Sequence, residues 1–590
     1  MPPYLKPVPV LILFLSGFMM LLAGCDSESN SDRLHALMDE AEEFEIRENP
    51  FRGGDDDEYL ENDRLQSVAM EDLERRYEFW TEKQEQLHSR VLRENLQLND
   101  QITYDSFQRQ VLSNINQHKY RSYLIPINHE GGFYNRMIGL ENRVPLDSSE
   151  DYENYIARLN AIPEFFNQHK DHMRTGMELG YTLPRVIFVD EYIYYIATHI
   201  KDDPEETGFF EPFKNYPDEI SEENRKQLSE SGRQAIAESV MPAYRSFIDF
   251  LEDEYIPASR ETIATVDLPD GEEYYNHLIE YHTTLPLSAR EIHQIGLDEV
   301  ERIREEMYEI IEEVEFDGSF SEFLDFLRTD PQFFVDRPED LLKEASFLSK
   351  RIDGKLPEIF HLHTLPRRPY GVEPVPDHLA PRYTGGRYSV GGGTRAGEYW
   401  VNTYNLPSRT LYTLEALTYH EAVPGHHLQI ALNQEMDDLP RRAGGLTAFS
   451  EGWALYAERL GLDVGLYENP YYNFGRLTYE MWRACRLVVD TGMHALGWTR
   501  EETIRFMTDN TALSHHEIDT ETNRYIAVPG QALAYKMGEL KIRELRDHYE
   551  EQLGSDFDLR DFHEAVLMNG PVSLPVLEQQ VHTFFEDKDL

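Results

Sequence analysis

One stretch of the chain contains residue types that bind a metal ion and activate water. Residues 411–432 read LYTLEALTYHEAVPGHHLQIAL and include His420, Glu421, His426 and His427. In an HExxH zinc helix the two histidines lie four residues apart, about 40° around the helix axis, so both imidazoles reach one ion. The glutamate beside the first histidine takes a proton from the attacking water. The stretch therefore predicts a metal site that uses His420 and a later histidine.

The spacing between the two histidines differs from that pattern. His426 follows His420 by six residues, about 240° on an unbroken helix, which would point the rings apart. Pro424 has no N–H for the helix ladder, and Gly425 accepts unusual torsions. We expect a local unwinding at Pro424-Gly425 that returns His426 to the metal, since such irregular helices are frequently functional. His427 is the second choice as ligand.

A third ligand is available downstream. Glu451 lies in the segment FSEGWALY, 25 residues after His426, where a neighbouring helix can deliver its carboxylate. Two histidines and one glutamate leave the fourth position of a Zn²⁺ ion open, as catalytic zinc requires. The alternative is a buried histidine pair with Glu451 as a helix cap.

Four separated segments carry a resemblance to a known family: HEAVPGHHLQ, SEGWALYAE, RLVVDTGMHALGW and RYIAVPGQALAYKMG. They look like the signature segments of a large bacterial family, domain of unknown function 885, and the resemblance covers most of the mature chain. That family resembles the helical gluzincins, which include oligopeptidases, the angiotensin-converting-enzyme type and helical carboxypeptidases. Their usual Gly-His-x-Leu sequence is matched by residues 425–428, with His426 in the ligand place. The two-residue insertion departs from their pattern.

The resemblance implies a mainly α-helical body with a deep cleft and the metal at its floor. It implies a zinc peptidase in which Glu421 moves the proton of the attacking water and the metal polarises the scissile carbonyl. Tyr525, Arg524 and His494 are candidates for stabilising the oxyanion, and Asp490 for orienting a histidine. Each has a structural alternative, because a tyrosine is usually a core residue and an arginine usually forms an ion pair.

The segment before the metal helix is rich in proline, glycine and β-forming residues. Residues 387–407 read RYSVGGGTRAGEYWVNTYNLP, which predicts a hairpin with residues 391–393 near the turn and a strand over 398–405. A peptidase needs a sheet edge to hold an extended peptide, and this strand ends close to His420 in sequence. We expect Tyr399, Val401 and Asn402 to bind substrate. The alternative is a hairpin that only covers the core.

The N-terminus has the layout of an export signal. Residues 1–24 contain Lys6, an apolar stretch from Val8 to Leu22, and small residues, too short for a convincing membrane span. The sequence Leu-Ala-Gly-Cys resembles the bacterial lipobox, which predicts acylation of Cys25. Asp26 resembles a signal for retention in the inner membrane. We expect a lipid-anchored envelope protein on the periplasmic side; the alternative is an ordinary signal peptide with an incidental cysteine.

The amino-acid composition limits the classes of molecule that the protein is expected to bind. The formal net charge is −53, and such a surface repels phosphate backbones, which argues against nucleic acid. The chain has two cysteines, so with Cys25 acylated no disulfide framework exists, and Cys485 in the apolar sequence ACRLVV is expected to be a core thiol. Nothing in the composition indicates the oligomeric state.

Helical periodicity dominates the rest of the chain. Residues 25–64 read as a flexible acidic tether with partial disorder, and residues 65–590 as one helical domain without repeats. Helices are predicted within 70–120, 220–255, 410–460 and 470–510. A capping box of Ser288 and Glu291 predicts the start of another that runs to Val314. Residues 515–517 are expected to be a solvated polar loop.

Together these observations predict zinc-dependent hydrolysis of peptide bonds in oligopeptides by a lipid-anchored protein. Two alternatives stay open: a metallohydrolase of another amide or ester, and a non-catalytic peptide-binding lipoprotein.

Overall fold

The structure is a computed structural model that describes residues 29–50, 63–188, 190–377, 379–380, 383–436, 440 and 446–588. The predicted signal peptide, Cys25, Asp26 and the acidic GGDDDE sequence lie outside these residues. The protein is mainly helical, with 71% helix and 3% strand, and the strands form one small sheet. The predicted fold class is confirmed to that extent.

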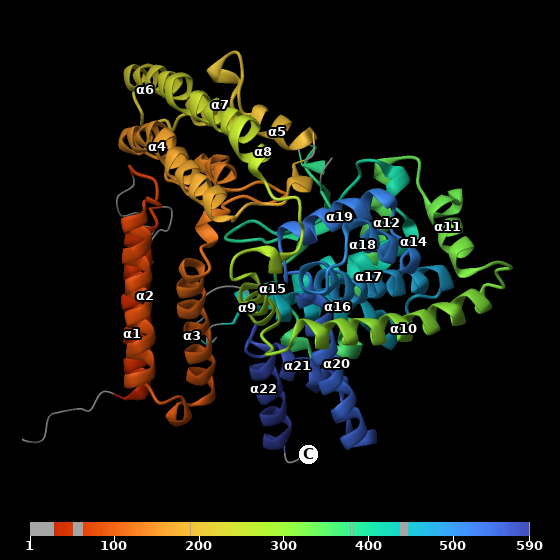
Figure 1. Cartoon of the computed structure of the whole chain (residues 1–590). Coiled ribbons are helices and arrows are strands. Elements are labelled where there is room, and N and C mark those ends of the chain that lie inside the picture. Colours follow the sequence, from red (N-terminus) through yellow and green to blue (C-terminus); the bar gives the residue numbers. More distant parts are fainter. Residues whose placement is uncertain are drawn as a thin grey trace, which may run out of the picture.

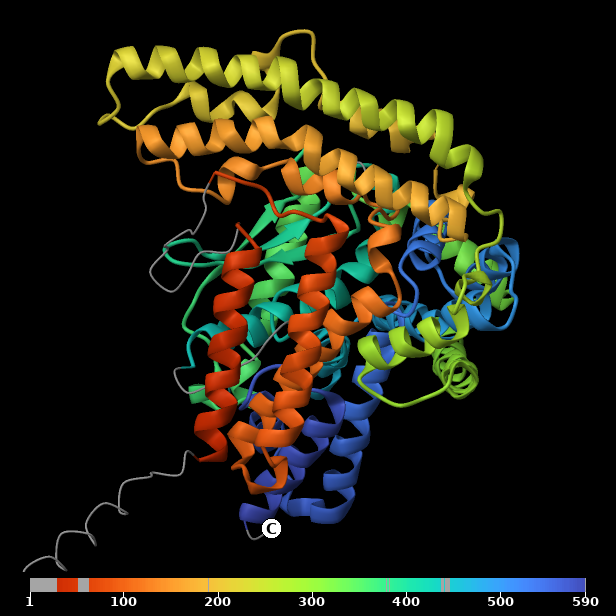
Figure 2. The same ribbon diagram turned by 60° about the vertical axis from the view of Figure 1, so that its left-hand side comes forward.

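The helices from α1 to α8, within residues 30–258, form two layers at one side of the molecule (Figure 1). One layer consists of α1 (Asn30–Glu48), α2 (Met70–Arg90) and α3 (Leu98–Lys119). The other consists of α4 (Ser149–Leu179), α5 (Asp190–Ala197), α6 (Glu222–Ala235), α7 (Met241–Phe250) and α8 (Ile256–Ala258). The helices α6, α7 and α8 join through two π-helical turns into one long rod, which lies along α4 (Figure 2).

The tether prediction for residues 25–64 is wrong over Asn30–Glu48, which form α1. Ser29 and Asp32 make a capping box at its start. Its buried residues are Leu34, Leu37, Met38, Ala41 and Phe44, a helical spacing that lets one face pack against α2 and α3. The acidic residues between them occupy the outer face, and their abundance hid this periodicity.

The larger body contains the remaining helices. Its long central pair is α10 (Ala289–Glu313) and α17 (Pro470–Ala495), which pack so closely that a Cβ on Gly296 would lie 2.8 Å from the Leu487 side chain. The predicted capping box of Ser288 and Glu291 starts α10. The others are α9 (Gly271–Thr283), α11 (Phe320–Thr329), α12 (Pro338–Asp353), α13 (Leu356–Ile359), α14 (Leu411–Glu421), α15 (His426–Gln434), α16 (Thr447–Asp463), α18 (Arg500–Asn510), α19 (His515–Ala527), α20 (Leu533–Leu553), α21 (Leu559–Leu567) and α22 (Leu574–Asp587).

The sheet has three strands, β1 (Tyr370–Pro374), β2 (Gly386–Ser389) and β3 (Gly397–Val401), in the order β1-β3-β2. The predicted hairpin is present: β2 and β3 are antiparallel, and Gly392 pairs with Arg395 at the turn. However, β3 also pairs with β1 in parallel. The predicted strand is therefore the centre of the sheet, and β2 is an outer strand.

Two further expectations concern Cys485 and the membrane. Cys485 is a free, buried thiol on α17, and burial raises its pKa well above the usual value. Among the described residues, no helix combines the length and the apolar composition that a membrane crossing needs.

Candidate metal centre

The break between α14 and α15 brings the two histidines back together. α14 ends at Glu421 and α15 begins at His426, and the backbone between them turns at Pro424 and Gly425. A Cβ on Gly425 would lie 1.9 Å from the carbonyl oxygen of His420, so only glycine allows this close approach. The indole of Trp453 donates a hydrogen bond of 2.9 Å to the carbonyl of Pro424. The predicted unwinding is present, and packing from α16 fixes it.

Three side chains converge at this break. Nε2 of His420 lies 3.4 Å from Oε2 of Glu451, and Nε2 of His426 lies 3.3 Å from the same oxygen. One ligand atom of each residue lies within 4.8 Å of the other two. Bonds of about 2.0–2.1 Å to a tetrahedral zinc ion would place ligand atoms roughly 3.3–3.4 Å apart. The donor set and its spacing therefore fit Zn²⁺.

The pKa values of His420 and Glu451 are shifted by the charges and hydrogen bonds of their neighbours. Burial alone would lower the pKa of His420, but hydrogen bonds to Glu451 and Glu458 raise it to about 10. Burial would raise the pKa of Glu451, but His426 and His420 hold it well below its usual range. The carboxylate is thus ionised beside positive charge. A divalent cation bound there would supply positive charge and release a proton from His420.

Glu458 contacts the Nδ1 side of the His420 ring, whereas Glu451 lies on the Nε2 side. Its Oε1 lies 2.8 Å from Nδ1 of His420, and its side chain is almost completely buried. Glu451 and Glu458 are seven residues apart on α16, two helical turns, so they lie on the same face. Arg483 on α17 lies 3.7 Å from the same carboxylate oxygen. Glu458 was missing from the sequence-based site, although its spacing from Glu451 was a usable signal.

Glu421 is fixed beside the three side chains by the sheet. Its Oε2 accepts a hydrogen bond of 2.8 Å from the backbone N–H of Tyr388 on β2. Because Tyr388 turns this N–H away from β3, the outer edge of β2 borders the metal centre. The carboxylate predicted to act as a base therefore lies next to the predicted ligands.

His427 is engaged elsewhere. Its Nδ1 accepts from the hydroxyl of Tyr388 at 2.9 Å, and its Nε2 donates to the carbonyl of Arg368 at 3.1 Å. Burial lowers the pKa of His427 to about 4, although the Arg368 carbonyl opposes this. With both ring nitrogens occupied, His427 is a neutral structural residue, and the geometry selects His426 as the second ligand.

Two predicted oxyanion donors are used for packing. The Tyr525 hydroxyl is buried and accepts from Trp482 Nε1 at 2.9 Å and Arg486 Nε at 2.8 Å. His494 accepts at Nδ1 from Thr265 and donates from Nε2 to the Tyr525 carbonyl. Neither makes a contact with the metal ligands among the described residues. Their hydrogen bonds tie α17 to α19, which argues against a direct role.

Asp490 is also a structural residue here. It accepts hydrogen bonds from the Tyr275 hydroxyl at 2.6 Å and the Gly530 N–H at 3.1 Å, and orients no histidine among the described residues. Burial raises its pKa to about 7, although these two bonds lower it.

Arg524 is the predicted donor with the most open position. It pairs with Glu521 and donates to Gln531 at 2.7 Å, and 22% of its side chain is exposed.

Arg387, on β2 beside Tyr388, is exposed and lies over the ring of Tyr383. Burial lowers the pKa of Arg387, but Tyr383, Glu421 and Glu130 raise it overall. Arg387 thus adjoins Tyr388, the residue that orients Glu421, and the sequence-based site did not include it.

The predicted substrate residues of the strand face the interior. Tyr399 is fully buried and its hydroxyl lies 3.5 Å from Thr418 on α14. Val401 is buried, and the Asn402 amide donates to the carbonyls at 380, 383 and 384. This burial argues against direct contact with substrate, because β3 is paired on both sides and its side chains hold the sheet on α14.

Two other clusters of ligand-type residues have different explanations. Residues 515–517 begin α19 instead of forming a polar loop, with Ser514 as N-cap. His361, Asp558 and Asp561 also lie close together, but Asp561 pairs with Lys588 at 2.7 Å and Asp558 with Arg560 at 2.6 Å. Positive side chains already neutralise these carboxylates.

Comparisons with known proteins agree with this fold. The crystal structure of a "putative lipoprotein" from Colwellia psychrerythraea matches with a TM-score of 0.84 and 27% identity, over 95% of this chain and 100% of that one. A "putative lipoprotein of unknown function" from Shewanella oneidensis matches with a TM-score of 0.66 and 20% identity, over 93% and 99% of the chains. No curated protein matches. The model of the bacterial proteins of unknown function called DUF885 matches residues 51–581, so the chain belongs to that family.

Proposed function

We propose that this protein is a zinc-dependent hydrolase that cleaves peptide bonds in oligopeptides. The observation that carries the proposal is the convergence of His420, His426 and Glu451 with tetrahedral spacing, next to an oriented Glu421. Two imidazoles and one carboxylate match the ligand set of catalytic zinc, which retains an open coordination position.

A bound zinc ion would supply a Lewis acid and lower the pKa of a coordinated water. Glu421 is placed to accept a proton from the attacking water and to pass it to the leaving amine. The N–H of Tyr388 holds the carboxylate in one orientation, and Glu458 holds the ring of His420 through Nδ1. These contacts pre-organise the base and one ligand before substrate arrives.

The oxyanion would be stabilised by a cation of this chain. Arg387 is the stronger candidate, because it is exposed, lies on the strand that holds Glu421 and interacts with that carboxylate. Arg524 is the second candidate. Glu130 links the two: its pKa is lowered first by a hydrogen bond from His129 and further by Arg524 and Arg387. Both guanidinium groups therefore contribute to the lowered pKa of Glu130.

The substrate class is inferred from the sheet. β2 is an outer strand, and the register turns the backbone of Gly386 and Tyr388 away from β3. The N–H of Tyr388 is already used to hold Glu421, so a peptide would pair with the carbonyl groups of Gly386 and Tyr388. An extended peptide can add to such an edge through main-chain hydrogen bonds, which gives affinity regardless of sequence. This edge replaces residues 398–405 as the proposed peptide platform, and it favours a peptidase within a deep cleft over a hydrolase of another amide or ester.

The location is proposed from the N-terminal sequence. A lipid on Cys25 would attach the protein to the bacterial envelope on the periplasmic side, with Asp26 favouring the inner membrane. The related crystal structure from Colwellia psychrerythraea is described as that of a "putative lipoprotein", which supports attachment to an envelope membrane.

The test uses the chain from residue 26 onward, purified and analysed for metal. We expect about one zinc per chain and cleavage of a peptide library, detected by mass spectrometry. Hydrolysis of esters or other amides without peptide cleavage would favour the second function class. Peptide binding without any hydrolysis would favour the non-catalytic lipoprotein.

A further inference from the structure

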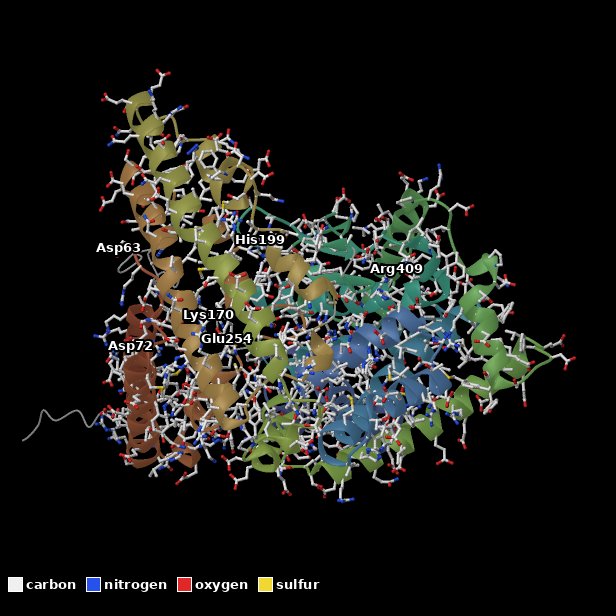
Figure 3. All side chains as sticks on the ribbon, turned by 45° about the horizontal axis from the view of Figure 1, so that its top comes forward. Asp63, Asp72, Lys170, His199, Glu254 and Arg409 are labelled. Atoms are coloured by element: carbon white, nitrogen blue, oxygen red, sulfur yellow. The ribbon has the colours of Figure 1, made fainter. Side chains whose placement is uncertain are left out.

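A pocket lies along α14, toward the N-terminal end of this helix, whereas the metal centre lies at its C-terminal end. It is lined by the sheet at Gly385 and Val401, by α14 at Leu417, by α17 at Tyr479, and by α19 at Glu517. Arg409, which precedes α14, also lines it. Figure 3 places Arg409 within the larger body, well away from Asp72 and Lys170 in the N-terminal layers. The pocket has a volume of about 60 Å³, which is enough for a carboxylate group or several waters.

Three elements lead from the pocket to the metal centre. Leu417 precedes Glu421 by four residues, one turn of α14 or about 6 Å along its axis. Gly385 precedes Tyr388, whose N–H holds Glu421, by three residues of the outer strand. On α17, Tyr479 stacks under the guanidinium of Arg483, which lies 3.7 Å from Glu458. The pocket and the metal centre are thus connected by α14, and Arg409 lies eleven residues before His420, roughly 16 Å along the helix axis.

Arg409 brings a cation into this pocket without a matching anion. Its Nε donates to the carbonyl of Tyr404 at 3.3 Å, and Nη1 lies 4.0 Å from the position of a Cβ on Gly385. Among the described residues it forms no ion pair within 4.0 Å, although the chain has 109 acidic and only 56 basic residues. In so acidic a protein, an unpaired guanidinium in a pocket is the feature that calls for a ligand.

Glu517 also lines the pocket, but it forms no ion pair with Arg409 among the described residues. Its nearest polar partner is Ser514, at 3.4 Å. Burial raises the pKa of Glu517, and Arg409 only partly opposes this shift. Because Arg409 and Glu517 form no ion pair within 4.0 Å in the part of the chain that the structure describes, the guanidinium remains available to another anion.

We propose that this pocket binds a carboxylate of the substrate through Arg409. A guanidinium presents parallel N–H donors that match a carboxylate, and Nη1 and Nη2 of Arg409 have no hydrogen-bond partner among the described residues. The carboxylate can be the C-terminus of a peptide or an acidic side chain several residues from the cleavage point. This inference rests on the proposed peptidase function and adds the class of peptide that it accepts.

The test measures peptide binding, so it does not depend on turnover. The protein carries Glu421→Gln, and the probes are N-acetylated tetra-alanine as the free acid, its C-terminal amide, and the amide with glutamate as the last residue. Binding is followed by calorimetry. We expect the free acid or the glutamate peptide to bind about tenfold to a hundredfold more tightly than the plain amide, the range for one charge-assisted hydrogen bond.

The variants identify the residue. Arg409→Gln should remove the preference, Arg409→Lys should retain part of it, and Arg245→Gln, an exposed arginine on α7, should leave it unchanged. A preference for the free acid assigns the C-terminus, and one for the glutamate peptide assigns the side chain. Equal binding of all three peptides, no binding of any, or a preference that survives Arg409→Gln would overturn the proposal.

The binding ratio also separates this proposal from the general one. If wild-type protein cleaves no peptide but the preference depends on Arg409, hydrolysis fails and the carboxylate pocket stands. If wild-type protein cleaves peptides without regard to a carboxylate, the pocket proposal fails and the peptidase stands.

Discussion

Glu458 and His420 form a buried contact of 2.8 Å between Oε1 and Nδ1, which leaves Nε2 of the histidine directed at Glu451. A carboxylate behind a metal-binding histidine fixes the ring and its tautomer and increases its basicity. Glu458→Gln should therefore lower zinc affinity by about 10- to 100-fold. Competition with a zinc-sensitive dye measures this, and Glu468→Gln, an exposed glutamate after α16, serves as the control. Unchanged affinity would show that Glu458 is only a packing residue.

The two adjacent histidines provide a matched pair of variants. His426→Ala removes a ligand directed at Glu451 and should abolish stoichiometric zinc binding. His427→Ala removes the partner of Tyr388 and Arg368 and should leave zinc content near that of the wild type. Metal analysis after gel filtration gives both values. The reverse pattern would mean that His427 is the ligand.

Glu421→Gln keeps the size of the side chain and its hydrogen bond from Tyr388, but removes the base. Zinc should remain bound while peptide hydrolysis falls by at least ~100-fold, the low end for a lost general base. Rates are measured on a peptide that the library digest selects, with Glu373→Gln on the exposed part of β1 as the control. Normal turnover in Glu421→Gln would exclude the proposed base.

Arg387→Gln tests the oxyanion donor. If the guanidinium stabilises charge that develops in the transition state, kcat should fall by about 10²–10³ with little change in KM. Arg395→Gln, in the turn of the same hairpin, controls for the loss of a positive charge. A rise in KM at constant kcat would instead assign Arg387 to substrate binding, and a similar loss of kcat in Arg524→Gln alone would favour Arg524.

Asp490 predicts a pH dependence of stability. Its pKa is about 7 in the folded protein, against an ordinary value of 3.8, so the folded state binds the proton more tightly than the unfolded state. That contribution stabilises the fold at low pH and is lost as pH rises from about 4 to about 7. The loss is up to roughly 4 kcal/mol, and Asp490→Asn should remove it. Urea unfolding of metal-free protein at pH 5 and pH 7.5 should show a smaller difference for the variant than for the wild type.

The sequence was most informative where local chemistry determines structure. The Pro424-Gly425 break follows from the missing N–H of proline and the missing Cβ of glycine, and the start of α10 from its capping box. The pairing of strands that are far apart in the sequence could not be predicted from such local signals. β1 contains Pro374 and lies in a proline-rich segment, so its parallel pairing with β3 gave no local signal, and β3 was assigned to the sheet edge.

The site showed the same limit. Tyr525 and His494 have the residue types that stabilise an oxyanion, but their contacts depend on how α17 packs on α19. Arg387 was overlooked because its position next to Glu421 arises from β2 meeting the end of α14, 34 residues further along the chain. Residue type identified what could react, and packing determined which of those residues meet.

The ordered start of α1 limits how far the protein can move from a membrane. If Cys25 carries a lipid, four residues separate it from Asn30, the first residue of α1, and the five Cα–Cα steps between them span at most about 18 Å when extended. The 19-residue helix α1 is itself longer, at about 28 Å. A lipid-anchored protein would therefore stay within a thin layer next to the bilayer. The amount of protein per unit of membrane area would then determine how often a peptide encounters it, and peptides would have to diffuse to the membrane surface to be cleaved.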